Sequence, residues 1–196
     1  MSEETGVTPQ ESGAAGAAPR VSVATVWLDG CSGCHMSLLD IDEKLLDPLE
    51  LVEFDRSPIN DIKRIDQPVD VGLIEGGVCN AENVHTLREF RRMCKVLVAV
   101  GECANTGGVP SMRNGLPLKR CLEESFIRGQ GTENAHIPDD PELPLLLNKV
   151  RPLHHVVTID HFLPGCPPSA DAFWRFLTEL LAGRDPGLPS PLIHFD

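Results

Sequence analysis

Two cysteines, Cys31 and Cys34, lie two residues apart directly after an apolar segment near the start of the chain. This spacing lets both sulfurs reach one centre, which is typical of ligands to a metal ion or an iron–sulfur cluster. The same motif at the start of a helix depresses a thiol pKa, so a thioredoxin-like dithiol is a second interpretation. A third interpretation is that one of the two cysteines packs in the core and the other has no chemical role.

Two single cysteines follow later apolar segments. Cys103 lies in GECANTGG, where Gly107 and Gly108 allow close backbone approach and N–H groups directed at a sulfur-rich anion. Cys166 lies in LPGCPPSAD, where the two following prolines fix φ and remove backbone donors. Such a stiff loop is suited to holding a sulfur that points inward. Together with Cys31 and Cys34, these two residues give four candidate thiol ligands.

The segments around these cysteines alternate between strand-like and helix-like patterns. Apolar and β-branched runs predict strands over residues 21–28, 49–54, 69–74, 95–100 and 155–159. Helical spacing predicts helices over residues 36–46, 82–93 and 170–181. The alternation implies right-handed crossovers and an α/β fold, flavodoxin-like, with an open parallel sheet flanked by helices. The four cysteines then arrive from three strand ends at the carboxyl edge, where such sheets bind ligands.

The remaining segments set the limits of this domain. Residues 1–20 have no hydrophobic period and predict a mobile tail, so residues 21–196 form the domain. Residues 121–152 are rich in Pro, Gly and acidic residues and predict a long irregular excursion. The Pro-rich end after Gly183 is expected to be a tail that packs on a surface the sequence does not identify, and Ser169 or Asp171 is expected to cap the last helix.

Composition excludes several classes of protein. Lys+Arg 17 against Asp+Glu 29 gives a net charge of −12, which argues against nucleic-acid binding. No apolar run approaches the roughly 18 residues of a membrane span. The first residues carry neither a secretory nor a twin-arginine signal, so we expect a cytoplasmic protein. In that reducing compartment, cysteines are more often ligands, catalytic thiols or core residues than disulfides.

The spacing of the four thiols also bears on which metal they would bind. A zinc ribbon uses paired Cys-x-x-Cys knuckles in a small module, whereas this chain has one pair and two distant single cysteines. One pair and two singles in glycine- and proline-shaped loops favour a cubane iron–sulfur cluster. A zinc-stabilised interaction module and a dithiol oxidoreductase using Cys31 and Cys34 stay open as alternatives.

Four motifs in order carry a resemblance to a known family. DGCSGCHMSLL at residues 29–39, EGG at 75–77, GECANTGG at 101–108 and PGCPP at 164–168 resemble the small subunit of nickel–iron hydrogenases. The VPSMRN extension at 109–114 most resembles the soluble, bidirectional NAD-reducing branch. The related respiratory subunit has adjacent cysteines, so the Cys-Ser-Gly-Cys motif favours a hydrogenase over a quinone reductase.

The resemblance implies a function as one part of an enzyme. It assigns Cys31, Cys34, Cys103 and Cys166 as ligands of one proximal 4Fe-4S cluster. This cluster would relay electrons between the H2-splitting NiFe site of a large subunit and a diaphorase module, with Fe–S clusters and FMN, that reduces NAD+. The chain itself would carry no complete active site. A sulfur-reducing or ferredoxin-linked hydrogenase is the alternative within the family.

Three further residues are candidates for a supporting or proton-relay role. Glu75 precedes two glycines at the expected sheet edge, Cys79 follows closely, and His35 is next to Cys34. His35 is expected on the solvent side rather than hydrogen-bonded to the cluster. For Glu75 a relay and a backbone-capping carboxylate are both open, and Cys79 is a non-ligand thiol near the cluster or a packed one. Cys94 and Cys121 have no motif and are expected in the core or at an interface.

Overall fold

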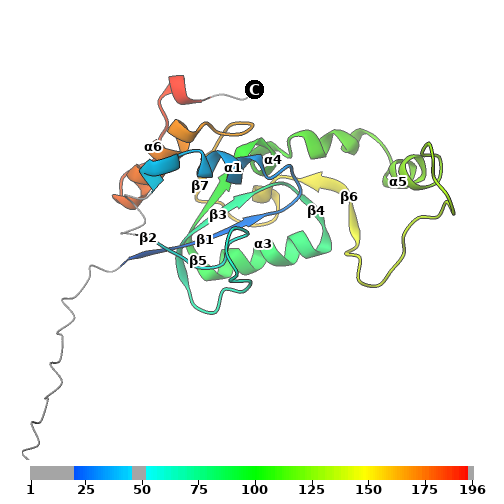
Figure 1. Cartoon of the computed structure of the whole chain (residues 1–196), viewed down its shortest axis with the longest axis horizontal. Coiled ribbons are helices and arrows are strands. Elements are labelled where there is room, and N and C mark those ends of the chain that lie inside the picture. The colour runs from blue at the N-terminus through cyan, green and yellow to red at the C-terminus, as the bar shows by residue number, and fades with distance from the viewer. Residues whose placement is uncertain (1–19, 46–51, 194–196) are drawn as a thin grey trace, which may run out of the picture.

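A five-stranded parallel sheet forms the centre of the protein in this computed structural model, which describes residues 20–45 and 52–193 (Figure 1). The strands are ordered β2-β1-β3-β5-β7 across the sheet. Their bounds are β1 Val21–Trp27, β2 Val52–Phe54, β3 Val69–Glu75, β5 Cys94–Val100 and β7 His161–Leu163. Counted within the sheet, this is the 2-1-3-4-5 order of flavodoxin-like folds, and it confirms the predicted fold class.

The register aligns the carboxyl ends of four strands. Trp27 pairs with Glu75, Glu75 with Val100, and Val100 with Leu163. After β1 and β3 the chain leaves in different directions, and in such sheets this switch point is where ligands bind. The loops that carry the four candidate cysteines all begin at this edge.

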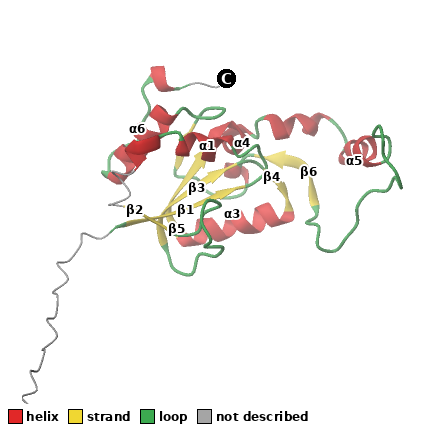
Figure 2. Ribbon diagram, in the orientation of Figure 1, coloured by secondary structure: helices red, strands yellow, loops and turns green. Residues whose placement is uncertain are grey.

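Helices cover both faces of the sheet (Figure 2). Helix α3 (Ala81–Met93) lies on one face, and the helices α1 (Gly33–Leu39) and α6 (Ala170–Leu181) lie on the other. Because both faces are covered, β3 and β5 are almost continuously buried, as expected of parallel strands. The Ser169 side chain accepts a hydrogen bond from the Ala172 amide and caps α6, which confirms one of the two predicted caps.

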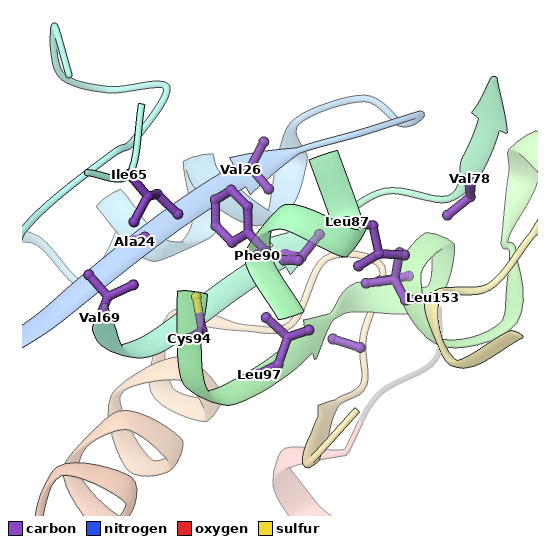
Figure 3. Close-up of a cluster of buried hydrophobic side chains, with 13 residues drawn as sticks. Ala24, Val26, Ile65, Val69, Val78, Leu87, Phe90, Cys94, Leu97 and Leu153 are labelled. Carbon is purple, nitrogen blue, oxygen red and sulfur yellow. The ribbon is translucent and has the colours of Figure 1, made fainter. Parts of the chain in front are cut away.

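Each face has its own apolar core. On the α3 face, Leu87 and Phe90 are fully buried and pack among strand residues such as Ala24 and Leu97 (Figure 3). On the other face, Phe173 and Phe176 of α6 are each 2% exposed. The C-terminal segment was predicted to pack as a tail, and the structure shows Leu188 and Leu192 packed against this second core.

The chain after β5 forms a small group of elements beside the main sheet. Helix α4 (Gly101–Thr106), the 3-10 helix η2 (Val109–Gly115) and helix α5 (Leu118–Phe126) follow one another, and α5 lies far from α6 (Figure 1). Strand β6 (Leu146–Arg151) returns and pairs antiparallel with the short strand β4 (Val78–Asn80). The prediction of an irregular segment over 121–152 is therefore wrong at both ends, because part of α5 and all of β6 lie within it.

Two other predicted elements differ from the structure. The late strand lies at His161–Leu163 instead of residues 155–159, where a 3-10 turn (η3, Leu153–His155) precedes an irregular stretch. The amides of residues 156 and 157 bond to the Leu153 carbonyl, so the β-branched residues pack on the core from a turn. The helix predicted over residues 36–46 is α1 followed by a 3-10 helix, η1 (Asp42–Leu45), and the positive φ of 59° at Asp42 separates them.

Part of the predicted tail, residues 1–19, lies outside the described residues, as do 46–51 of the segment between β1 and β2. Among the described helices, none has both the length and the apolarity needed to cross a bilayer.

Candidate functional site

The first pair of cysteines lies where β1 passes into α1. Ser32 adopts a left-handed conformation, with φ 62°, between Cys31 and the start of the helix, so the chain turns sharply there. Cys31 is exposed, whereas Cys34, in the first turn of α1, is half-buried. A Cβ on Gly33 would lie 3.2 Å from Cys31 Sγ, so the absent side chain leaves room for that sulfur.

Cys103 lies on α4, directly after β5. This helix begins at Gly101, whose φ is +79° and where any Cβ would overlap the Cys34 sulfur. At Gly108, with φ +46°, a Cβ would lie 3.0 Å from Cys103 Sγ. Glycines thus let the backbone of this loop approach two of the sulfurs closely.

Cys166 lies in the loop between β7 and α6. Backbone hydrogen bonds join this loop to α4, since the Glu102 amide donates to the Gly165 carbonyl at 2.9 Å. The Gly165 amide in turn donates to Glu102 Oε1 at 3.4 Å. These bonds fix the Cys166 loop beside the helix that carries Cys103.

The three loops meet around one hollow of about 490 Å³, which we call the thiol pocket. Its wall includes Cys31, Cys103 and Cys166, together with Cys79, a thiol outside the set of four candidate ligands. Cys34 lies beside them, close enough for Cys31 and Cys103 to raise its pKa. The structure therefore brings together the four cysteines that the sequence analysis singled out.

The thiol pKa values show how strongly these sulfurs interact. Burial raises the pKa of Cys34 far above its ordinary value, and the charge and hydrogen bond of Glu75 raise it further. Burial also raises the pKa of Cys103, with Cys166 and Cys31 adding to the effect. Thiolates in such a group disfavour one another unless a positively charged centre lies among them.

A buried polar network lies behind Cys34. Glu75, at the end of β3, accepts a hydrogen bond from the His35 amide at 3.0 Å, and its Oε1 lies 3.3 Å from His35 Nδ1. His35 Nε2 lies 3.0 Å from the Thr25 hydroxyl, which is 2.7 Å from Ser57 Oγ. All four side chains are buried, so the prediction of a solvent-side His35 is wrong. Packing of α1 against β1 and β3 places the ring inside.

Sequence reasoning missed Thr25 and Ser57 in this network and Arg113 in the thiol pocket. The only local signal for Thr25 is a polar residue within an otherwise apolar strand. The guanidinium of Arg113 donates to the carbonyls of Leu147 and Asn148 at 3.0 and 3.3 Å. Its place on the pocket wall depends on the pairing of β6 with β4, which no local pattern predicts.

The other cysteines differ in environment. Cys79 donates from its sulfur to Asn83 Oδ1 at 3.3 Å, and burial together with Asp29 raises its pKa to about 11 against the opposing effect of Arg113. Cys94 is 4% exposed within the core, as predicted. Cys121 is half-buried on α5.

The pocket and its donor set fit an iron–sulfur cluster. Within residues 20–45 and 52–193, no three His, Cys, Asp or Glu side chains are grouped closely enough to bind a single metal ion. The thiol pocket, in contrast, has room for a larger group among its sulfurs. Four thiolates, delivered here by three segments of the chain, are the ligands that such clusters take.

The fold and this pocket define an open α/β protein with a cysteine-lined site at its topological switch point. Residues 31–180 match the family described as NADH ubiquinone oxidoreductase, 20 Kd subunit, and the chain belongs to this family.

The curated proteins most similar in sequence include subunits of hydrogenases. The chain is 44% identical to subunit delta of the NAD-reducing hydrogenase HoxS of Cupriavidus necator, over 100% of this chain and 95% of that protein. It is 40% identical to one subunit of the F420-non-reducing hydrogenase of Methanothermobacter marburgensis, over 88% of this chain and 57% of that one. The chain thus spans little more than half of the second relative.

Solved structures agree with these relatives. A chain of an NAD+-reducing [NiFe]-hydrogenase in the H2-reduced state superposes with a TM-score of 0.88 at 50% identity, covering 90% of this chain and 99% of that chain. A [NiFeSe]-hydrogenase from Dm. baculatum matches with a TM-score of 0.55 at 16% identity, and this second likeness shows the fold alone. The predicted resemblance to hydrogenase small subunits is confirmed.

Proposed function

We propose that this chain is the small, electron-transfer subunit of a cytoplasmic NAD-reducing NiFe hydrogenase. In this proposal Cys31, Cys34, Cys103 and Cys166 hold one 4Fe-4S cluster. Electrons pass through it between the NiFe site of a large subunit and a diaphorase module with Fe–S clusters and FMN that reduces NAD+. The observation that carries the proposal is the convergence of these four thiols at the switch point of the sheet.

The protein's part in this function is to hold and insulate the sulfurs. When bound, a 4Fe-4S cluster accepts and releases one electron at a time. Glycines 101 and 108 let the backbone approach the sulfurs, and the bonds between Glu102 and Gly165 keep two ligand loops in register. Local burial and nearby charges, including Asp29 and Arg113 on the pocket wall, are the factors that set a cluster potential.

We assign Glu75 and His35 a positioning role toward Cys34. The Glu75 carboxylate accepts from the amide next to Cys34 and lies close enough to its thiol to raise the thiol pKa. His35 lies against the other side of that carboxylate. Cys79 also lies on the pocket wall and is not assigned as a ligand.

An apolar rim beside the thiol pocket supports a large protein partner. We define the rim as four exposed residues of η2, of the first position of β6 and of the position before it: Val109, Met112, Leu145 and Leu146, which are 45 to 80% exposed. Two of them line the pocket itself. Exposed apolar surface of this kind marks a protein interface, and a hydrogenase large subunit is the partner we propose for it.

The NAD-reducing branch is favoured over the other hydrogenases by the extent of the match. The chain covers 95% of the NAD-reducing relative, but 57% of the F420-non-reducing one. The sulfhydrogenase 2 subunit delta of Pyrococcus furiosus is 28% identical over 81% of this chain.

Replacing Cys166 with alanine tests the cluster. In the anaerobically purified complex, we expect Cys166→Ala to lose the cluster or convert it to a species with less iron. Iron, acid-labile sulfide and the EPR spectrum of the dithionite-reduced complex measure this change. The control is Cys121→Ala, which removes a thiol of α5 outside the pocket.

Three results would contradict the proposal. A full 4Fe-4S content and full activity in Cys166→Ala would exclude this ligand. Zinc in place of iron would favour an interaction module. An iron-free chain with thiol–disulfide activity that depends on Cys31 and Cys34 would favour a dithiol oxidoreductase.

A further inference from the structure

A second hollow, of about 510 Å³, lies on the other side of the segment that carries Cys103. We call it the basic hollow, because its wall includes Lys149 and Arg151 of β6 and the imidazoles of His154 and His155. Neutral side chains complete the polar part of the wall: Asn105, Thr106, Ser111 and Asn114.

The charge of this hollow is opposite to that of the chain. The protein has a net charge of −12, yet no carboxylate of residues 20–45 or 52–193 lines the basic hollow. Lys149 and Arg151 form no ion pair within the described part of the chain, whereas Arg91 and Lys95, for example, are paired with Asp160 and Asp70. Both side chains are exposed, so two positive charges face solvent without an ionic partner among the described residues.

The fold holds these two cations on one face of β6. They are two residues apart on a strand, so their side chains point to the same side. Between them, Val150 is 3% exposed, and both of its backbone groups bond to the Asn114 side chain, at 2.7 Å and 2.8 Å. This clamp joins β6 to η2 and fixes the backbone from which both charges project.

The basic hollow is next to the thiol pocket. Helix α4 contributes Cys103 to the thiol pocket and Asn105 and Thr106 to the basic hollow. In the same way, η2 contributes Pro110 to the first and Ser111 to the second. A macromolecule bound at the basic hollow is thus separated from the thiols by one short segment of chain.

We propose that the basic hollow is the docking surface for an acidic face of one redox partner protein, the NAD+-reducing module. The inference rests on the proposed function and adds the surface and the charge of the partner. A protein fits better than a small anion, because binding pockets enclose most of a small ligand, and here the four basic side chains are exposed. Opposite charges would steer the partner to this site and fix its orientation.

The test reverses both charges in the complete hydrogenase complex. We expect Lys149→Glu with Arg151→Glu to lower the affinity for the NAD+-reducing module about 100-fold, because two attractive charge interactions become repulsive. Native mass spectrometry across a salt series measures which subunits dissociate. H2-dependent NAD+ reduction should fall, while iron content, the EPR signal and H2-dependent viologen reduction stay unchanged. The matched control is Arg88→Glu with Arg92→Glu, two exposed arginines of α3.

The outcomes distinguish this inference from the proposed function. Unchanged association and NAD+ reduction in the double variant would overturn the inference, as would loss of the H2-splitting subunit in place of the NAD+-reducing module. Binding of inorganic phosphate that the double variant abolishes, with association intact, would make the hollow a small-anion site. Absence of iron from the unmodified complex would instead contradict the proposed function.

Discussion

Gly101 has no side chain at a position where any Cβ would overlap the Cys34 sulfur. We expect Gly101→Ala to displace Cys34 and lower the cluster content of the complex severely, as measured by iron and sulfide analysis. The φ of +79° adds conformational strain of about 1 kcal/mol. Gly131→Ala separates the two effects, because Gly131 has a similar φ of +78° and nothing within 4 Å of the added Cβ. A cluster content equal in the two variants would mean that the overlap has no effect.

Glu75 accepts a hydrogen bond from a buried amide and contacts a buried imidazole. Replacing it with leucine leaves the His35 amide without an acceptor, so we expect a loss of about 1–3 kcal/mol in the free energy of unfolding. Glu75→Gln keeps an oxygen acceptor and should lose less. Chemical denaturation monitored by tryptophan fluorescence compares them, and equal stability of Glu75→Leu and the unmodified protein would refute the role of this carboxylate.

At the scale of elements, Asp160 connects α3, β5 and the segment before β7. Its Oδ2 accepts from Arg91 at 2.6 Å and from the Leu97 amide at 2.7 Å. Burial by itself would raise the pKa of Asp160, but these hydrogen bonds and the Arg91 charge outweigh it and lower the pKa below 3.8. The carboxylate therefore stabilises the fold above pH 3.8, and this contribution disappears as the pH falls through the lowered pKa.

Asp160→Asn should accordingly cost about 1 kcal/mol at pH 7, a modest figure because water screens a partly exposed side chain. Urea denaturation at pH 7 and at successively lower pH should show the difference from the unmodified protein narrowing with acid. Asp139→Asn, in the exposed segment between α5 and β6, serves as the control. A difference that grows on acidification would contradict the assigned sign.

At the scale of the whole molecule, the apolar rim beside the thiol pocket lies outside both cores and is exposed to solvent. Met112 is 77% exposed and Leu145 is 80% exposed. We expect Met112→Glu with Leu145→Glu to reduce recovery of the assembled complex about tenfold or more, because charges would be buried in the interface. Ile59→Glu with Ile62→Glu is the matched control, since these residues are 42% and 45% exposed. Affinity purification through a tagged partner measures the recovery.

The local patterns of the chain were enough to predict its main elements. Periodicity located α6 residue for residue and gave the interiors of β1, β3, β5 and α3, because alternation and helical spacing are properties of neighbouring residues. The alternation of strands and helices then restricted the topology, and the restricted topology predicted that the four cysteines meet at one edge. The Ser169 cap was likewise readable, since its hydrogen bond spans only three residues.

Features that depend on distant contacts were decided only by the tertiary structure. His35 is buried because Glu75, 40 residues away, and Thr25 supply its polar contacts. Residues 155–159 have a strand-like composition, but their backbone turns and β7 forms later. The basic hollow exists because β6 pairs with β4 and the Asn114 side chain bonds to it across 36 residues. The spacing of the cysteines along the sequence determined which thiols could meet. Long-range packing decided what surrounds them, because the burial of a side chain and the charges near it depend on contacts with segments that are distant in the chain.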